Sequence, residues 1–506
     1  MSTALKLEPA QEYIAESPLM EHPQVRALIN SVMANAIKFN ELEGELFKIL
    51  RELFEQMIKT VLEKTDEMIK YSAVRQGWEV KDTHQRTLET VIGEITFKRR
   101  YYQRLTATGK YIYSYLLDEV LGIEKGKNIS PLLVEMAVSL AAENTYRKSA
   151  EFIKSMLNVN ISHESIRKEV QAIGEHIAKW DKKTGIDGIG IKEVPLLVIE
   201  VDGAMLKRQQ RRKPKKKRKE DKKFELKTAV IYEGWEEKYR GKYKLKNSTY
   251  FVHGGDGKEF WAALERHLNR TYCLEGCKRI IVGGDGANWI RHGAEEIGAE
   301  YQYCRFHLER DIRQLFSATP DLKDSIKRTI ETNDFKGFNI IMDSLLIQEK
   351  NPKRKETIND FKSLINNVWS GLTDWRKRGK TVRDEARGLG VIEPNVGHTI
   401  ARRFKHRCAS WTPQGAINLA KVRCAVRNGN LIELIRASVP MLAEESKTTA
   451  NIDIYNSYWF KRQADGLRKN DPADWCRATL PAIKGPSSKE REFTKLIGRL
   501  TTDWLF

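Results

Sequence analysis

Residues 194–206 form the most apolar short run of the chain and limit the folds that it can adopt. A run of this length and composition predicts a strand that is buried on both faces, rather than a helix. Asp202 stands at the predicted end of this strand and is followed by Gly203. Because burying an unpaired charge is costly, a carboxylate here needs a compensating group, and a bound metal ion is one such group.

Asp285 ends a second run of the same kind, in which an apolar strand meets an acid, a glycine and the start of a helix. The chain thus predicts three strands, a helix, a strand, a helix and a fifth strand, which is the element order of an RNase H-like α/β domain. Asp202 and Asp285 would lie close together across such a sheet. The predicted strands are 194–206, 224–232, 249–253, 279–285 and 299–307.

Paired carboxylates of this kind hold Mg²⁺ (or Mn²⁺), a hard cation that prefers oxygen ligands and keeps some of its waters. Two such ions about 4 Å apart can activate an attacking oxygen and stabilise the leaving oxygen of a phosphodiester. The alternative is that Asp202 and Asp285 each cap the helix that follows, which is common for Asp near a helix start. The occurrence of both acids in this strand order favours the metal site.

The charge balance points to a polyanionic partner. The 506 residues include 88 Lys and Arg against 68 Asp and Glu, a net charge of +20 with a pI near 9.4. Such a balance favours nucleic acid, although a basic soluble surface is the alternative. No run approaches the roughly 18 apolar residues of a membrane span, and the N-terminus lacks a signal-peptide pattern. The six cysteines contain no Cys-x-x-Cys pair, which fits reduced thiols in a cytosol.

The first 85 residues form a predicted helical region. Phe47, Leu50, Phe54, Met57 and Val61 fall at steps of three and four and give one apolar face. We expect this face to be packed within the chain; a dimerising coiled coil is the alternative, although the heptads are not sustained.

Residues 86–125 form a predicted β-ribbon, rich in β-branched and aromatic residues. Basic and aromatic residues interleave at 98–102, which suits a nucleic-acid surface. The same pattern equally suits a strand edge that its charges protect from further pairing.

Residues 126–182 form a predicted helix-turn-helix domain. One helix precedes the turn at 158–160, and Ser162 caps a second helix whose inner stripe is apolar. A recognition helix places its N-terminal residues against base edges, so four exposed residues become candidate DNA contacts. They are His163, Ser165, Arg167 and Lys168.

The segment between the first two strands, residues 207–223, is too charged to pack. It predicts a loop that lies along phosphates, although a nuclear-localisation signal has the same composition. Its candidate DNA contacts are Arg211, Arg212, Lys215, Lys216 and Lys217.

The core, residues 193–307, is followed by a polar helical segment at 308–385, and residues 386–425 return to the core. Glu393 lies between an apolar pair and Pro394, which suits the first turn of a helix, so we expect Glu393 at the N-cap. The helix that follows offers Arg402 and Arg403 to DNA. Residues 426–506 have no assignment beyond a mixture of helix and polar loop.

Together these motifs resemble a known family, the DDE transposases of bacterial insertion sequences, ISLre type, which stand among the uncharacterised protein families and are related to Mutator-like transposases. The resemblance covers about residues 86–425. Pro394 departs from it, because a smaller or polar residue is expected after the glutamate, and so does the long basic loop. The matching segments are 199–203, 232–235, 284–290, Cys304-x-x-His307, 392–393 and 410–416.

The resemblance implies a catalytic, metal-binding triad of Asp202, Asp285 and Glu393 in an RNase H-like core interrupted by an all-helical insertion. It implies a DNA transposase that uses Mg²⁺ (or Mn²⁺), with two ions, for cleavage and strand transfer at terminal inverted repeats. The partners would be double-stranded element and target DNA and further copies of the chain, in a bacterial cytoplasm at the nucleoid, with no membrane. The alternatives are a nuclease without strand transfer and a catalytically silent helix-turn-helix regulator.

Cys304 and His307 form the signature pair of that resemblance, with a role that the sequence leaves open. A zinc site is one alternative, since Cys273 and Cys277 precede them, but their spacing is loose for a zinc knuckle. A structural or DNA-facing role for His307 is favoured. The sequence does not reveal the terminal repeats, the target site, the oligomeric state or the order of excision and insertion.

Overall fold

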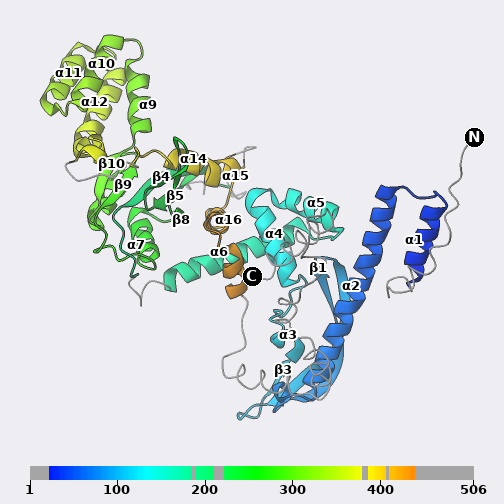
Figure 1. Ribbon diagram of the computed structural model, residues 1–506. Helices are drawn as coiled ribbons and strands as arrows, with labels where there is room; N and C mark the ends of the chain where they lie inside the picture. Colours follow the sequence, from blue (N-terminus) through cyan, green and yellow to red (C-terminus); the bar gives the residue numbers. More distant parts are fainter. Residues whose placement is uncertain (1–21, 184–189, 210–221, 379–385, 406–408, 439–506) are drawn as a thin grey trace, which may run out of the picture. The chain divides into compact units, whose positions relative to one another are not determined.

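The computed structural model describes residues 22–183, 190–209, 222–378, 386–405 and 409–438 (Figure 1). These residues form a mixed α/β structure. The chain divides into two compact units. The first comprises residues 1–55, 87–95 and 125–440, and the second comprises 56–86, 96–124 and 441–506. No helix among the described residues is long and apolar enough to span a membrane.

The N-terminal helices are α1 (Pro23–Met33) and α2 (Phe39–Ile69), and α2 contributes to both units. The predicted apolar face of α2, from Phe47 to Val61, does not pack: its five side chains are between 43% and 63% exposed. Ile49 and Ile69, elsewhere on the helix, are buried instead. The prediction of a packed face is therefore wrong, and the coiled-coil alternative stays a prediction.

A three-stranded sheet in the order β1-β2-β3 follows, which is the predicted ribbon. It begins at residue 79 rather than at the predicted 86. The short helix α3 (Leu116–Val120) comes directly after it. The strands are β1 (Glu79–Thr90), β2 (Gly93–Leu105) and β3 (Tyr111–Ser114).

The interleaved basic and aromatic run of β2 is largely occupied within the second unit. Arg99 is buried and forms an ion pair with Asp118. Arg100 forms an ion pair with Asp66 of α2 at 2.6 Å, and Tyr102 is fully buried. The prediction that this run is a nucleic-acid surface is therefore wrong for these three residues, which hold α2 and α3 against the sheet.

Three helices precede the central sheet: α4 (Pro131–Glu143), α5 (Tyr146–Leu157) and α6 (His163–Lys183). Asn158 ends α5 in the left-handed region at φ 53°, where Asn is tolerated. Ser162 Oγ accepts a hydrogen bond from Ser165 N–H at 2.9 Å, as expected of an N-cap. Ile166, Val170 and Ile173 are buried, so the predicted inner stripe of α6 is confirmed.

The central sheet has five strands in the order β10-β9-β4-β5-β8. β4 pairs with β9 in parallel and with β5 antiparallel, β5 pairs with β8 antiparallel, and β9 with β10 in parallel. A separate hairpin of β6 (Trp235–Tyr239) and β7 (Lys242–Leu245) lies between β5 and β8 in the chain. The strands of the sheet are β4 (Leu197–Lys207), β5 (Lys223–Tyr232), β8 (Thr249–His253), β9 (Ile280–Gly284) and β10 (Glu300–Tyr303).

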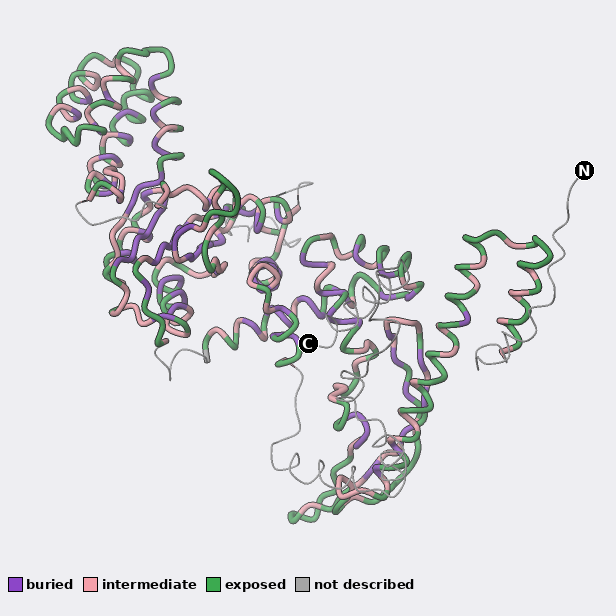
Figure 2. The backbone as a smooth tube through the Cα atoms, in the orientation of Figure 1, coloured by how far each residue is buried: buried purple, intermediate pink, exposed green. Residues whose placement is uncertain are grey.

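Both faces of the sheet are covered, as the near-continuous apolar composition of β4 predicts (Figure 2). Leu197, Ile199 and Val201 pack with α7 (Gly257–Leu268) and α8 (Asn288–Glu296) on one face. Val198 and Leu206 belong to a second cluster, which includes α6 and α16 (Pro413–Asn428). Side chains alternate along a strand, so Glu200 and Asp202 share the face of Val198.

The helical insertion, predicted at 308–385, begins at residue 305 and continues to 377, with a core of its own, and residues 379–385 lie outside the described residues (Figure 1). The chain then continues through α14 (Ile392–Val396), the π-helical turn η5 (Gly397–Ala401), α15 (Arg402–Phe404), α16 and α17 (Leu431–Ser438). The insertion contains α9 (Arg305–Phe316), α10 (Pro320–Glu331), α11 (Phe335–Gln348), α12 (Pro352–Asn367), α13 (Trp369–Leu372) and the 3₁₀ turn η4 (Trp375–Lys377).

Candidate active site

Asp202 lies within β4, not at its end. The strand continues to Lys207 and stays paired with β5 throughout, so the prediction that the strand ends at Asp202 is wrong. Because strand residues follow Asp202 directly, it does not cap a helix. The glycine after it faces Glu225: a Cβ on Gly203 would lie 2.0 Å from the Glu225 carboxylate, so a larger residue would require that side chain to move.

Asp285 directly follows β9, the parallel neighbour of β4. The register places Glu200 opposite Gly283, so two further steps along both strands bring Asp202 and Asp285 to the same level. Asp285 Oδ1 accepts a hydrogen bond from Ala287 N–H at 3.1 Å, which holds the turn before α8. The predicted neighbourhood of the two aspartates is thus confirmed by the strand register.

Glu393 occupies the first turn of α14, whose N-cap is Val391 rather than Glu393 as predicted. Its carboxylate lies close enough to Asp202 to affect the ionisation of that residue. The pKa of Asp202 is raised to about 7, first by burial, then by repulsion from Glu393 and, more weakly, from Asp285. The Gly203 N–H and the positive charge of Lys405 act in the opposite direction. The three predicted acids therefore share one electrostatic environment.

Glu200 connects two of these acids, a role that was not predicted, although the residue lies in the matching segment 199–203. It is 1% exposed, and its Oε2 accepts hydrogen bonds from the N–H groups of Gly390 and Ile392 at 2.9 and 3.2 Å. The Tyr232 hydroxyl donates to its Oε1 at 2.6 Å. Because these N–H groups lie at the start of α14, the buried Glu200 carboxyl group takes the place of a capping side chain there, and burial raises its pKa.

His307, on α9, touches the third acid from the other side. Its Nε2 lies 3.2 Å from Glu393 Oε1, and the imidazole is almost fully buried. Its Nδ1 is buried without a hydrogen-bond partner among the described residues. Cys304, the N-cap of the same helix, is buried, which raises the pKa of its thiol. The signature pair therefore belongs to the carboxylate site, and its histidine orients Glu393.

The described residues contain no group of three His, Cys, Asp or Glu side chains that converges on a single point as a metal cage would. The zinc alternative, which needs Cys273, Cys277, Cys304 and His307 together, is therefore wrong. Asp202, Asp285 and Glu393 likewise do not converge on one point, as three ligands of a single ion would. A magnesium site makes a smaller demand, because Mg²⁺ is often held by one or two carboxylates together with waters and substrate phosphates. Asp202 and Asp285, on adjacent strands and without a basic side chain in ion-pair contact among the described residues, fit that demand.

The predicted DNA contacts of α6 lie at its N-terminal end. His163, Arg167 and Lys168 are exposed and Ser165 is half-buried. Arg167 donates two hydrogen bonds to Glu164, at 2.6 and 2.9 Å, an exposed pair that costs little to open. The predicted contacts of the basic loop, residues 211, 212 and 215–217, lie outside the described residues.

The two arginines after α14 differ. Arg402 is exposed and lines a hollow of about 400 Å³ with Pro394, His398 and Lys405. Arg403 instead packs near the rings of Tyr146 and Trp411, at 5.5 and 5.3 Å, and burial lowers its pKa. Arg402 and Lys405 therefore present the positive charge of this segment to the surface, whereas Arg403 helps to hold it in place.

The fold and site define an α/β protein with three carboxylates in one environment. The model of the Uncharacterised protein family (UPF0236) matches residues 32–438, and the chain belongs to this family. A UPF0236 protein of Caldanaerobacter subterraneus subsp. tengcongensis is 27% identical over 422 residues, 83% of this chain and 84% of that protein, and its name joins eleven designations. The UPF0236 protein in the vanSb 3′ region of Streptococcus gallolyticus is 26% identical over 84% of this chain and 91% of its own length.

Among solved structures, the Drosophila P element transposase strand transfer complex covers 62% of this chain and 81% of its own, with 10% identity. Its TM-score is 0.21, which is too low for an argument about function.

Proposed function

We propose that this chain is a DNA transposase that cleaves DNA strands and joins them to a target, using Asp202, Asp285 and Glu393 with Mg²⁺ or Mn²⁺. The observation that carries the proposal is the shared environment of the three carboxylates, in which Glu393 and Asp285 raise the pKa of Asp202. Like charges are gathered at a cost, and such gatherings are typical of functional sites.

The fold supports the same proposal. The sheet order, with β4 central, β5 antiparallel to it, and β8, β9 and β10 parallel to it, agrees with an RNase H-like core. The helical insertion separates the two aspartates from Glu393 in the chain, as the resemblance to DDE transposases implies. The eleven designations in one relative's name, which we take as separate gene copies, suit an element that copies itself.

In this proposal each acid has a distinct part. Asp202 and Asp285 are fixed by adjacent strands, and Glu393 approaches from a helix that Glu200 and His307 hold in place. Bound Mg²⁺ or Mn²⁺, with two ions, would supply the charge that activates an attacking oxygen and stabilises the leaving one. The side chains themselves provide ionised oxygens at set positions, first for attack by water and then by a DNA 3′ hydroxyl.

The exposed N-terminal end of α6 suits recognition of the element's ends, and the basic loop suits contact with any DNA. We infer that the chain acts as a homodimer or higher oligomer on DNA, since two ends must be brought together. In the alternatives, a nuclease would cut without joining and a silent regulator would bind without cutting.

One assay tests the proposal. The protein is incubated with DNA that carries the ends of its encoding element, a target plasmid and Mg²⁺, and cut and joined products are separated on a gel. We expect both products from the wild type and neither from Asp285→Asn or Glu393→Gln, with DNA binding retained. Glu356→Gln, an exposed acid on α12, serves as the matched control, because Glu385 lies outside the described residues.

The possible outcomes of this assay distinguish the proposed transposase from its alternatives. Cut products without joined products would favour a nuclease. Binding without either product would favour the regulator, and activity that survives in Glu393→Gln would remove this residue from the triad.

A further inference from the structure

A groove of about 700 Å³ adjoins the third acid. It is lined by the β6–β7 hairpin on one side and, on the other, by Arg387 and by three residues that flank Glu393, namely Val391, Pro394 and Asn395. Pro394 also lines the basic hollow next to Arg402. The groove therefore lies beside the segment that carries Glu393, although none of the three acids lines it.

The walls of the groove carry flat groups. The Arg387 guanidinium lies 3.8 Å from the centroid of the Tyr243 ring, and both side chains are half-buried. Trp235 also lines the groove and stacks on Trp375, with ring centroids 6.1 Å apart and planes at 15°. Aromatic rings and guanidinium planes are the surfaces on which unstacked nucleic-acid bases lie.

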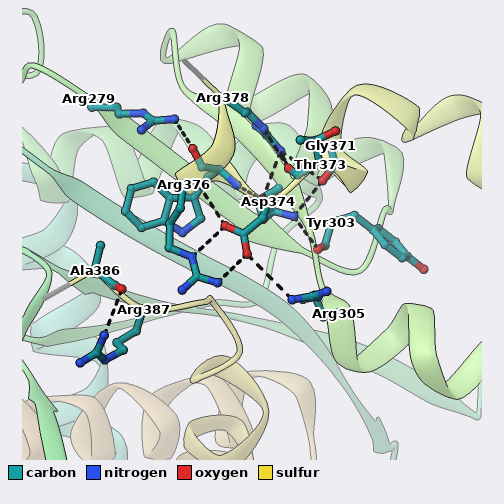
Figure 3. Close-up of polar contacts among 12 residues, drawn as sticks. Arg279, Tyr303, Arg305, Gly371, Thr373, Asp374, Arg376, Arg378, Ala386 and Arg387 are labelled. Carbon is teal, nitrogen blue, oxygen red and sulfur yellow. Dashed lines mark hydrogen bonds and ion pairs between the residues drawn. The ribbon is translucent and has the colours of Figure 1, made fainter. Parts of the chain in front are cut away.

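Two further arginines, Arg376 and Arg305, contact Asp374 near Arg387 (Figure 3). Arg376 lies next to the Arg387 segment, since a Cβ on Gly388 would be 3.6 Å from its Nη2. Arg376 forms a two-pronged contact with Asp374 at 2.9 and 2.7 Å, and Arg305 lies 3.9 Å from the same carboxylate. Two guanidinium groups thus share one carboxylate, and the pair keeps a net positive charge.

Arg305 adds an exposed positive charge beside Asp374. It begins α9, two residues before His307, which contacts Glu393, and its side chain is 63% exposed. An exposed guanidinium fits a phosphate oxygen with bidentate geometry. A ligand with both a flat base and a phosphate would meet both features at once.

We propose that this groove binds an unpaired nucleotide of the DNA strand next to the cut site, with its base on the Tyr243–Arg387 surface and its phosphates along Arg376 and Arg305. The inference rests on the proposed DNA function and adds a site to it. It predicts that the chain prefers DNA in which the strand beside the duplex is unpaired, because pairing would keep the base out of the groove.

The test measures dissociation constants by fluorescence anisotropy for two probes, a duplex that ends in an unpaired thymidine stretch and the same duplex fully paired. We expect the wild type to bind the unpaired probe on the order of 10-fold more tightly, the effect of about one stacked base. Tyr243→Leu should lose this preference and Tyr243→Phe should keep it. Tyr239→Leu is the matched control, since Tyr239 is on the same hairpin, 65% exposed and outside the groove lining.

The proposed phosphate contact of Arg305 is tested separately, by the salt dependence of binding. Arg305→Gln should reduce the slope of log affinity against log salt for the unpaired probe by about 0.7, one phosphate contact to a single strand. Arg313→Gln, an exposed arginine on the same helix, should leave the slope unchanged.

The outcomes separate the two proposals. If the wild type binds neither probe, the proposed DNA function and this inference both fail. If it binds both probes and Tyr243→Leu matches Tyr239→Leu, the groove is not a nucleotide site, whereas the DNA function stands. A folded Tyr243→Leu, checked by circular dichroism, keeps that comparison valid.

Discussion

The carboxylate of Glu200 accepts a hydrogen bond from the backbone N–H of Ile392 across 192 positions of the chain. Glu200 precedes Asp202 by two residues on the same face of β4, and Ile392 directly precedes Glu393. This one contact therefore ties the strand of the first acid to the helix of the third. It fixes their relative position without occupying the site itself.

We expect Glu200→Leu to lower DNA cleavage by about 10- to 100-fold, the range for residues that orient metal-binding groups. The loss follows because Gly390 N–H and Ile392 N–H lose their acceptor and α14 loses its anchor. Glu200→Gln keeps an acceptor oxygen and should retain most of the activity, while DNA affinity should hold in both variants. A cleavage assay beside a binding titration makes the comparison, and equal activity in Glu200→Leu and the wild type would contradict it.

The raised pKa of Asp202 predicts an unusual pH dependence of the stability of the metal-free protein. Its folded-state pKa of about 7 lies above the ordinary value of 3.8, so the folded state holds the proton more tightly. Stability therefore falls as pH rises from about 4 to about 7, and the loss persists above pH 7. Asp202→Asn should remove this loss and raise stability at pH 8 by on the order of a few kcal/mol.

Thermal melts with EDTA at pH 8 and at pH 4 measure this effect. At pH 4 the two proteins should differ little, because the aspartate is then protonated when folded and about half protonated when unfolded. Added Mg²⁺ should stabilise the wild type and leave Asp202→Asn unchanged. A wild type that melts above Asp202→Asn at pH 8 without metal would show that Asp202 is not in a repulsive site.

Much of the fold was predictable from the sequence because buried segments have a recognisably apolar composition. The strands that carry Asp202 and Asp285 are apolar on both faces, and a strand covered by helices has no other composition available. The stripe of Ile166, Val170 and Ile173 likewise identified the packed side of α6. These predictions concern local pattern, in which sequence spacing and spatial position correspond closely.

The wrong predictions concern features that depend on contacts between residues far apart in the chain. Asp202 and Gly203 were placed at the end of a strand, yet both stay inside β4, because the pairing with β5 continues to Lys207. The five-residue face of α2 had the right period for a helix, but period alone does not say which side meets the rest of the chain. In the sequence, Glu200 does not differ from other acids near a strand. Its role depends on hydrogen bonds from Gly390 and Ile392, which are far away in the chain.

The N-terminal end of α6 gives a further prediction. Arg167→Ala together with Lys168→Ala should weaken binding to the element's ends, since both side chains are exposed there. A lost base contact would cost about 1 to 3 kcal/mol and relax specificity, whereas a lost phosphate contact would mainly reduce the salt slope. Lys179→Ala with Lys182→Ala removes the same charge from the far end of the helix and should matter less. Equal affinity and salt dependence for both double variants in a gel-shift titration would count against the placement.

His307 allows the orientation of Glu393 to be tested apart from its charge. The imidazole is held in a nearly closed position, with Nε2 at 3.2 Å from Glu393 Oε1, so its removal frees the carboxylate to rotate away from Asp202. We expect His307→Ala to reduce cleavage by about 10- to 100-fold with DNA affinity unchanged. His307→Gln, which can still donate to Glu393, should recover part of the loss. Because Glu393 raises the pKa of Asp202, its rotation should also lessen the pH dependence of stability in metal-free His307→Ala. A variant that loses DNA binding instead would place His307 on the DNA and not behind the acid.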